Sequence, residues 1–487
     1  MEPGNGHERL RALDEAFLHL ERVETPMHVG AVAILERAPF LDADGRFRLG
    51  DVRRLIASRM QLLPKFRQRV VPVPFGRGRA VWTDQEGFTV ADHVHLTSLP
   101  EPGNRRDLFA LAERLMGQLL DRDRPLWEMW FVDGVDGGEH VGLIHRSHHT
   151  LTDGVSGVDL AMAVLDFSPE PMILDDDGWE AGPAPEPATL VSESFRRTLA
   201  FPRDAASVAR RLLDAPRDCA SEAIRLGRSL ASFAEGALVA PRLSINDGIG
   251  VGRSFQTVNV PLDTIRRVSR TFGCTVNDVV LAAVSSALGR LLDDRGELHE
   301  ELVVKAFCPV SVRIDEQRME LGNRISAMFV PLPVAEVDAR SRLHAVRVST
   351  ESLKERGQAN GAAAVLQLSE LASPAMLGLA ARAAHRQPLA NVIVTNIPGP
   401  DAALYCLGAR MLEVYPIAPL SQNLTVNVAL LSYGGNVHFG LLGDGAATRD
   451  LERLAGGIED ALYEMHDLPE VRGPEVRGPE VAPTARV

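Results

Sequence analysis

Hydrophobic and polar positions alternate in different ways along the first third of the chain. In "LRALDEAFLHLE", Leu13, Phe17 and Leu20 recur at helical spacing. The following "MHVGAVAILE" is rich in small and β-branched residues and predicts a strand. The segments "LWEMWFV" (126–132) and "HVGLIHRSHH" (140–149) flank "DGVDGG", which predicts a β-hairpin. Because "VSGVDLAMAVLDF" returns to helical spacing, the polar stretch "HRSHHTLTDG" should lie at a strand-to-helix junction.

The last half of the chain repeats this mixture of predicted elements. The stretch "TVNDVVLAAVSSALGRLL" predicts a capped helix. Predicted strands are "SFQTVNVPL", "LVVKAFCPVSVR", "RISAMFVPLPV", "NVIVTNIPGP", "LTVNVALLS" and "NVHFGLLGD". A chain of 487 residues is too long for one ordinary core, so we expect two α/β halves of related architecture.

Composition divides the chain into four segments. Residues 1–167 and 250–467 are the two predicted domains, and the repetitive "PEVRGPEVRGPEVAP" places a disordered tail at 468–487. Between the domains, 168–249 begins with a Pro- and acid-rich linker (168–190). It continues as a helical stretch (191–242) with nine arginines and six acidic residues, either an amphipathic connector or a surface for anionic lipid or acyl carriers.

Charge and cysteine usage narrow the class of protein. The net charge of −13 disfavours a nucleic-acid partner. The four cysteines are Cys219, Cys274, Cys308 and Cys406. Their wide spacing suggests neither a disulfide framework nor a zinc knuckle, so we expect reduced thiols in a cytoplasmic protein. The start "MEPGNGHERLRALDEAF" lacks the apolar core of a signal peptide, and no apolar run reaches about 18 residues, so membrane contact should be peripheral.

The polar stretch at 145–154 admits three interpretations. Its histidines can be structural residues satisfied at a strand end. They can form a metal site from His145, His148, His149 and Asp153, although neighbouring strand residues face opposite ways and would not easily converge on one ion. His149 can instead act as a general base, because a histidine is largely neutral at pH 7. Asp153 would then hold the loop, helped by the conformational freedom of Gly154. No GxSxG elbow, P-loop or GxGxxG fingerprint is present.

A family resemblance favours the third interpretation. "HHTLTDG" resembles the HHxxxDG motif of the CoA-dependent acyltransferase superfamily, which includes chloramphenicol acetyltransferase, plant acyltransferases and peptide-synthetase condensation domains. Further stretches resemble, in order from about residue 10 to about residue 465, the bacterial wax ester synthase/diacylglycerol acyltransferase family. They are "LDEAFLHLERVETPMHVGAVAILE", "RPLWEMWFVDGV", "NDVVLAAV", "PVSVR…LGNRISAMFVPLPV" and "TNIPGP".

The resemblance implies both a fold and a reaction. The fold would be α/β (α+β), with two chloramphenicol acetyltransferase-like domains, each a mixed sheet flanked by helices, and an active-site tunnel between them. Acyl-CoA would enter the tunnel from one side and a hydroxyl acceptor from the other. His149 would be the general base and His148 a supporting residue. Neither a covalent acyl-enzyme nor a cofactor or metal is implied, and acyl-CoA is a substrate.

The same resemblance gives structural roles to polar residues in both halves. Asp153, beside Gly154, would pair with an arginine, for which Arg313 in "PVSVR" is the candidate. The alternative for Arg313 is a surface ion pair of little energetic value. Asn277 and Asp278 begin the "NDVVLA" helix and are either its N-cap or residues that shape the tunnel.

Two further groups are candidates for the substrate tunnel. Pro125, Leu126 and Trp127 are expected in its wall, although a strand tryptophan is more often a core residue. Thr395 and Asn396 are candidates for the donor to the oxyanion.

The sequence therefore predicts an O-acyltransferase that forms triacylglycerol or wax ester from acyl-CoA and diacylglycerol or a long-chain alcohol. Such a cytoplasmic enzyme would associate peripherally with the inner membrane or lipid inclusions. Two alternatives remain open: a superfamily acyltransferase acting on a polyketide-type alcohol or a carrier-bound acyl group, and a non-catalytic lipid-inclusion coat protein. No motif encodes the preferred length of the acyl chain, the preferred acceptor or the oligomeric state.

Overall fold

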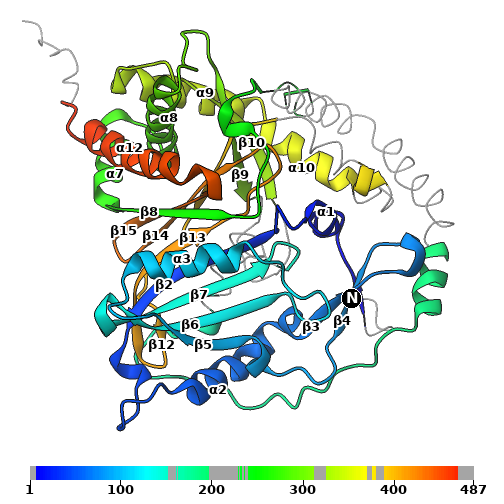
Figure 1. The fold of residues 1–487 in the computed structure, drawn as a ribbon. Coiled ribbons are helices and arrows are strands. Elements are labelled where there is room, and N and C mark those ends of the chain that lie inside the picture. The colour runs from blue at the N-terminus through cyan, green and yellow to red at the C-terminus, as the bar shows by residue number, and fades with distance from the viewer. Residues whose placement is uncertain are drawn as a thin grey trace, which may run out of the picture.

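Two six-stranded mixed sheets form the centres of two halves, which are stacked on each other (Figure 1). The computed structural model describes residues 7–151, 161, 163–196, 229, 231–232, 235, 240–311, 325–369, 376–379 and 389–469. Helices flank both sheets, so the predicted α/β class with two mixed sheets is confirmed. The four-segment division of the chain and the tunnel stay predictions.

The first sheet contains most strands of the N-terminal half. Its order is β12 (Tyr405–Cys406), β13 (Ala409–Ile417), β2 (His28–Glu36), β7 (His140–His148), β6 (Trp127–Val135) and β5 (Val94–Ser98). All neighbours are antiparallel except β5 and β6. The predicted β6–β7 hairpin is confirmed, with Trp127 opposite Ser147.

The second sheet belongs to the C-terminal half. Its order is β10 (Ile325–Leu332), β9 (Val304–Ser311), β11 (Val392–Ile397), β14 (Val426–Tyr433), β15 (Asn436–Asp444) and β8 (Arg253–Pro261). The central strand β11 runs parallel to both β9 and β14. All six strands coincide with segments predicted from sequence.

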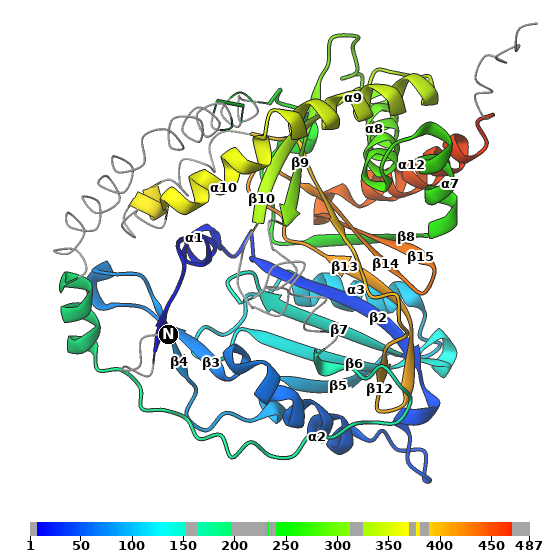
Figure 2. The same cartoon turned by 180° about the vertical axis from the view of Figure 1, so that it is seen from behind.

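Helices and a small third sheet complete the described structure. The labelled helices are α1 (Ala12–Leu20), α2 (Leu49–Arg59), α3 (Arg105–Met116), α7 (Leu262–Phe272), α8 (Val276–Asp294), α9 (Ala339–Glu355), α10 (Gln358–Ser369) and α12 (Thr448–His466), and a further helix covers residues 187–196. The small sheet has the order β1 (Glu8–Arg9), β4 (Val81–Asp84) and β3 (Gln68–Val71). Both views place α7, α8, α9 and α12 at the end of the molecule away from α2 (Figure 2). Among the described helices, none alone is long and apolar enough to span a bilayer.

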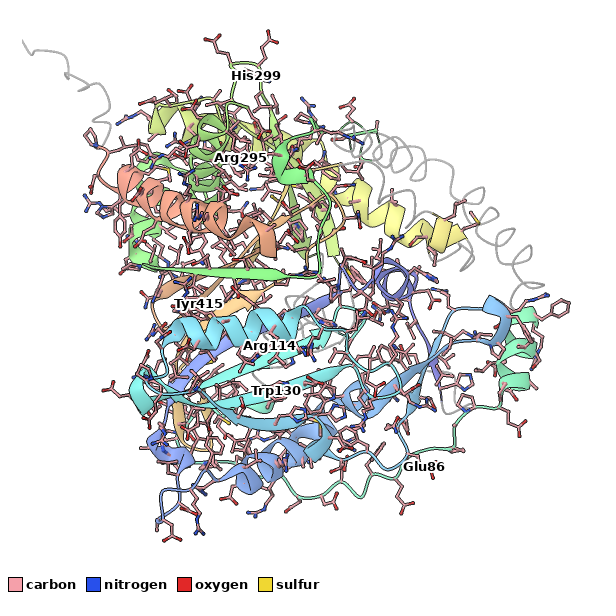
Figure 3. The ribbon with its side chains drawn as sticks, viewed as in Figure 1. Glu86, Arg114, Trp130, Arg295, His299 and Tyr415 are labelled. Atoms are coloured by element: carbon pink, nitrogen blue, oxygen red, sulfur yellow. The ribbon has the colours of Figure 1, made fainter. Side chains whose placement is uncertain are left out.

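Strand β13 ties the two halves together. It lies in the first sheet beside β2, although β14, the next strand of the chain, lies in the second sheet. Tyr415 of β13 lies at the junction of the halves (Figure 3) and packs edge-on against His438 of β15, with ring centroids 5.2 Å apart. Ile397 and Tyr433 belong to the same apolar cluster as Trp127. The halves therefore share core contacts and do not merely touch.

Two local predictions need correction. The composition predicts linker throughout 168–190, but a helix already begins at residue 187. Asn277 and Asp278 are the predicted N-cap candidates of α8, whereas the cap is Thr275, whose side chain accepts the N–H of Asp278. Asp278 is the third helical residue, and its carboxylate accepts the N–H of Thr275 at 2.8 Å, which completes a capping box.

Candidate active site

The histidine pair lies at the end of β7, where the backbone of each histidine is hydrogen-bonded to a neighbouring segment of the sheet. The N–H of His148 donates to the carbonyl of Leu126 (2.9 Å), before β6, and the N–H of His149 donates to Met27 (2.7 Å), before β2. The chain then turns, because the N–H of Leu151 donates back to the carbonyl of His148. Backbone bonds on two sides thus fix where both histidines leave the sheet.

The imidazole of His149 is stacked on an aromatic ring from α1. The ring centroids of Phe17 and His149 are 4.0 Å apart and their planes differ by 13°. Both side chains are half-buried. The hydroxyl of Thr150 donates to the carbonyl of Asp14, which ties the turn to the same helix. Helix α1 therefore fixes the plane of the His149 ring.

His148 is buried, and the contacts of its ring define its tautomer. Nδ1 accepts the backbone N–H of Thr150 at 3.0 Å, so this nitrogen carries no proton. In the neutral ring the proton is then on Nε2, which lies 3.2 Å from Oε1 of Glu21. Since Nδ1 is committed to an N–H donor and Nε2 faces a carboxylate, His148 is poorly placed to accept a proton from a substrate.

Glu21 is a buried carboxylate held by several donors. Its Oε1 accepts the N–H of Met27 (3.2 Å), and its Oε2 accepts two bonds from the Arg122 guanidinium (2.8 and 3.2 Å). Burial favours the neutral acid, but hydrogen bonds from His148 and Arg122 outweigh that effect and lower the pKa of Glu21 to about 2. Glu21 is therefore ionised at neutral pH and links Met27, which binds His149, to His148.

A third histidine completes this cluster from the neighbouring strand. His28 lies directly opposite His148 on β2, with ring centroids 6.2 Å apart, and its Nε2 is 3.6 Å from Oε1 of Glu21. Burial is the main reason why the pKa of His28 lies well below its usual value, and the Arg146 cation lowers it further. His28 is thus neutral. Sequence reasoning missed both Glu21 and His28, although each lies in a stretch that carries the family resemblance.

The predicted tunnel residues before β6 have mainly structural contacts. Leu126 is buried and its carbonyl holds His148. Trp127 is fully buried, donates from Nε1 to the carbonyl of Phe66 (2.8 Å), and stacks on His93 at 4.6 Å. Pro125 is also buried. These contacts match the core interpretation of Trp127, and a tunnel-wall role stays a prediction.

The other predicted site residues are placed as follows. Asp278 is buried and accepts the hydroxyl of Thr350 at 2.7 Å, whereas Asn277 is half-buried. On β11, Thr395 is half-buried and Asn396 is exposed. Their proposed part in binding the oxyanion stays a prediction.

Asp153, Gly154 and Arg313 lie outside the described residues, so their pairing stays a prediction. Within the described ranges, no group of three or more His, Cys, Asp or Glu side chains is arranged to hold a metal ion. His148 and His149 also face different partners, Glu21 and Phe17, and do not converge on one point.

Comparisons with known proteins assign the chain that carries this site to a family. A model of the wax ester synthase/diacylglycerol acyltransferase catalytic domain matches residues 10–280, and a model of the C-terminal domain of the same family matches residues 321–466. The chain belongs to the wax ester synthase/diacylglycerol acyltransferase family. It is therefore an acyltransferase, and the resemblance noted in the sequence is confirmed.

The similarity to relatives and to solved structures extends over almost the whole chain. The Mycobacterium tuberculosis H37Rv protein named "Probable diacyglycerol O-acyltransferase tgs1" is 30% identical over 470 residues, covering 94% of this chain and 95% of that protein. The wax ester synthase/diacylglycerol acyltransferase from Marinobacter aquaeolei VT8 has 26% identity and a TM-score of 0.64, covering 94% of this chain and 98% of that one. A trichothecene 15-O-acetyltransferase from Fusarium sporotrichioides, at 12% identity and a TM-score of 0.61, covers 94% and 95% and shares the fold.

Proposed function

We propose that this family member transfers a long-chain acyl group from acyl-CoA to the hydroxyl of diacylglycerol or a long-chain alcohol, forming triacylglycerol or wax ester. The observation that carries the proposal is the unequal environment of the histidine pair. Nδ1 of His148 accepts an N–H and its buried Nε2 faces the Glu21 carboxylate at 3.2 Å, so His148 is poorly placed to take a substrate proton, and the half-buried ring of His149 is held flat against Phe17. His149 is therefore the general base, as the family motif implies.

The proposed reaction needs one base and one ternary complex. His149 takes the proton of the acceptor hydroxyl while its oxygen attacks the thioester carbonyl, which gives a tetrahedral oxyanion. The C–S bond then breaks, the ester is released, and the CoA thiolate takes the proton from the His149 imidazolium. General-base assistance of this kind contributes about 10²–10⁴-fold. Positioning of both substrates in the proposed tunnel between the halves supplies much of the rest.

The surrounding residues position the base. Phe17 holds the plane of the His149 ring, and Glu21 holds the protonated Nε2 of His148 and the peptide of Met27 that binds His149. Asp153 and Arg313 would tie the loop after the pair to the second half. No metal or cofactor enters this scheme, and acyl-CoA is consumed as substrate.

The test is CoA release from palmitoyl-CoA with hexadecanol, and separately with a diacylglycerol, by wild type and His149→Ala. His140→Ala is the matched control, because His140 begins the same strand that His148 ends. We expect acceptor-dependent release to fall at least about 10²-fold in His149→Ala. It should persist in His140→Ala, and circular dichroism should show both variants folded.

Equal release by wild type and His149→Ala would exclude His149 as the base. Turnover with a carrier-bound acyl group but not with acyl-CoA would favour the polyketide-type alternative. Absence of turnover with every acceptor, together with lipid binding that survives His149→Ala, would favour the coat-protein alternative.

A further inference from the structure

A compact tip is formed by two segments that are distant in sequence. The turn Pro74–Gly76 connects β3 to β4, and Val73 at its start packs with Leu190 of the helix over 187–196. Contact is close at the end of this helix, because a Cβ on Gly78 would collide with Oγ of Ser194. The turn and the helix end, defined here as the β3–β4 tip, therefore form one surface.

Two phenylalanines of this tip are exposed. Phe75 is 91% exposed, the largest value among the exposed large apolar side chains of the described residues, and Phe195 is 61% exposed. Phe75 also has a left-handed backbone (φ 60°, ψ 15°), which a bulky residue rarely adopts. The strained backbone at Phe75 is not offset by packing, because the ring is exposed to solvent. Strain of this kind is typical of functional sites.

Positive charge surrounds the two rings. Arg77 and Arg196 are exposed next to Phe75 and Phe195, and the segment 72–79, "PVPFGRGR", contains no acidic residue. The nearby acid Glu193 lies 3.3 Å from the guanidinium of Arg9, so its charge is opposed by that cation. A basic, aromatic tip on a chain of net charge −13 is complementary to an anionic surface.

A second exposed apolar segment lacks this charge. Phe167, Met172 and Ile173 are 56%, 57% and 48% exposed, but the segment 167–173, "FSPEPMI", contains Glu170 and no basic residue. An anionic surface would repel it. The contrast distinguishes the tip from apolar exposure alone, and it supplies a control surface on the same protein.

We propose that the β3–β4 tip docks this enzyme on anionic phospholipid surfaces, with Phe75 and Phe195 inserted among the head groups and Arg77 and Arg196 on the phosphates. Aromatic rings combined with basic side chains are suited to the membrane interface. The choice of lipid as the partner rests on the proposed function, because a long-chain alcohol or diacylglycerol is dissolved in such a surface. Docking through a tip at the edge of the N-terminal half leaves the rest of the chain in water.

The experiment is flotation of the full chain with phosphatidylglycerol/phosphatidylcholine vesicles and with pure phosphatidylcholine vesicles. The variants are Phe75→Ser/Phe195→Ser, Arg77→Gln/Arg196→Gln and the control Phe167→Ser. Wild type should float with the anionic vesicles only. Each arginine contributes roughly fivefold near such a surface, so the arginine variant should bind about 30-fold more weakly. The phenylalanine variant should lose about tenfold or more, and the control should match wild type.

Acyl transfer to a short, water-soluble alcohol, measured without vesicles, separates docking from catalysis. It should be equal in all four proteins, because none of the substituted residues belongs to the catalytic site proposed above. Loss of flotation in both tip variants with this activity retained supports the proposal. The proposal is overturned if either tip variant floats as well as wild type. It is also overturned if wild type binds neutral vesicles equally well, or if Phe167→Ser loses flotation. If no protein shows acyl transfer but flotation depends on the tip, the docking surface stands and the proposed reaction fails.

Discussion

Phe17 and His149 lie in face-to-face contact, with ring centroids 4.0 Å apart and planes 13° apart. Such aromatic pairs are worth about 0.5–1.5 kcal/mol beyond the area they bury. Replacing Phe17 by Ala leaves the His149 ring free to rotate away from the position that general-base catalysis needs. We expect kcat to fall about tenfold, whereas KM for acyl-CoA stays within about twofold of wild type because Phe17 is not proposed to bind CoA.

Two matched variants test this interpretation of Phe17. Phe17→Tyr preserves the stack and should keep most of the activity. Phe47→Ala removes a similarly parallel stack, with Phe40 at 5.3 Å and 7°, where the half-buried Phe47 packs against the core of the N-terminal half. It should lower stability but leave kcat per folded molecule unchanged. A kcat loss that is equal in Phe17→Tyr and Phe17→Ala would contradict a role for the ring contact.

Glu21→Gln should make the free energy of unfolding depend less on pH in the acidic range. The folded-state pKa of Glu21 is about 2, below its ordinary 4.5, so its contribution is complete above pH 4.5 and disappears as the pH falls toward 2. The contribution at pH 7 is about 3 kcal/mol. Urea unfolding of both proteins should therefore show a difference that is largest at pH 7 and falls to roughly half by pH 3.

The same substitution has a catalytic consequence. The neutral amide introduced by Glu21→Gln would lack the charge that faces Nε2 of His148 and that binds Arg122, so the peptide of Met27 and the histidine pair lose a fixed anchor. We expect a lower kcat at all pH values, with KM little changed. A stability difference that stays constant from pH 7 to pH 3 would show that Glu21 is not the depressed carboxylate described here.

Local patterns explain how far the sequence could predict this site. The β6–β7 hairpin and the location of the histidine pair at its end follow from strand composition and turn residues, which act over a few positions. The contacts of Phe17 and Glu21 with the histidines depend on how α1 packs against the end of β7, and no periodicity encodes that packing. The capping box of Thr275 and Asp278 is a local pattern that the sequence contains. Asn and Asp are themselves common N-caps, so the sequence favours Asn277 and Asp278 over the true cap, Thr275.

Asp278→Ala tests whether the polar start of α8 is structural. Asp278 is buried and accepts three bonds, from the N–H and hydroxyl of Thr275 and from the hydroxyl of Thr350. Its removal should lower the free energy of unfolding by about 2–4 kcal/mol. Below the unfolding transition, kcat per folded molecule should stay within about twofold of wild type. Asn277→Ala, at a half-buried position, should cost less stability.

An opposite result for Asp278→Ala would reassign the residue. A large fall in kcat at unchanged stability would mean that Asp278 shapes the substrate path, which is the other interpretation of the motif. Thermal unfolding followed by circular dichroism, with single-turnover kinetics on the same samples, separates the two roles.

His145→Leu should remove a source of acid instability from β7. Burial lowers the pKa of His145 to about 4, and its Nε2 is buried without a hydrogen-bond partner. The unfolded chain binds a proton at His145 below about pH 6.5, whereas the folded chain does so only near pH 4, so the wild type loses about 3 kcal/mol as the pH falls through this window. Leucine neither titrates nor leaves a polar atom unpaired. Urea unfolding from pH 7.5 to pH 4 should therefore show a flatter profile for His145→Leu, and parallel profiles would exclude His145 as a buried neutral group.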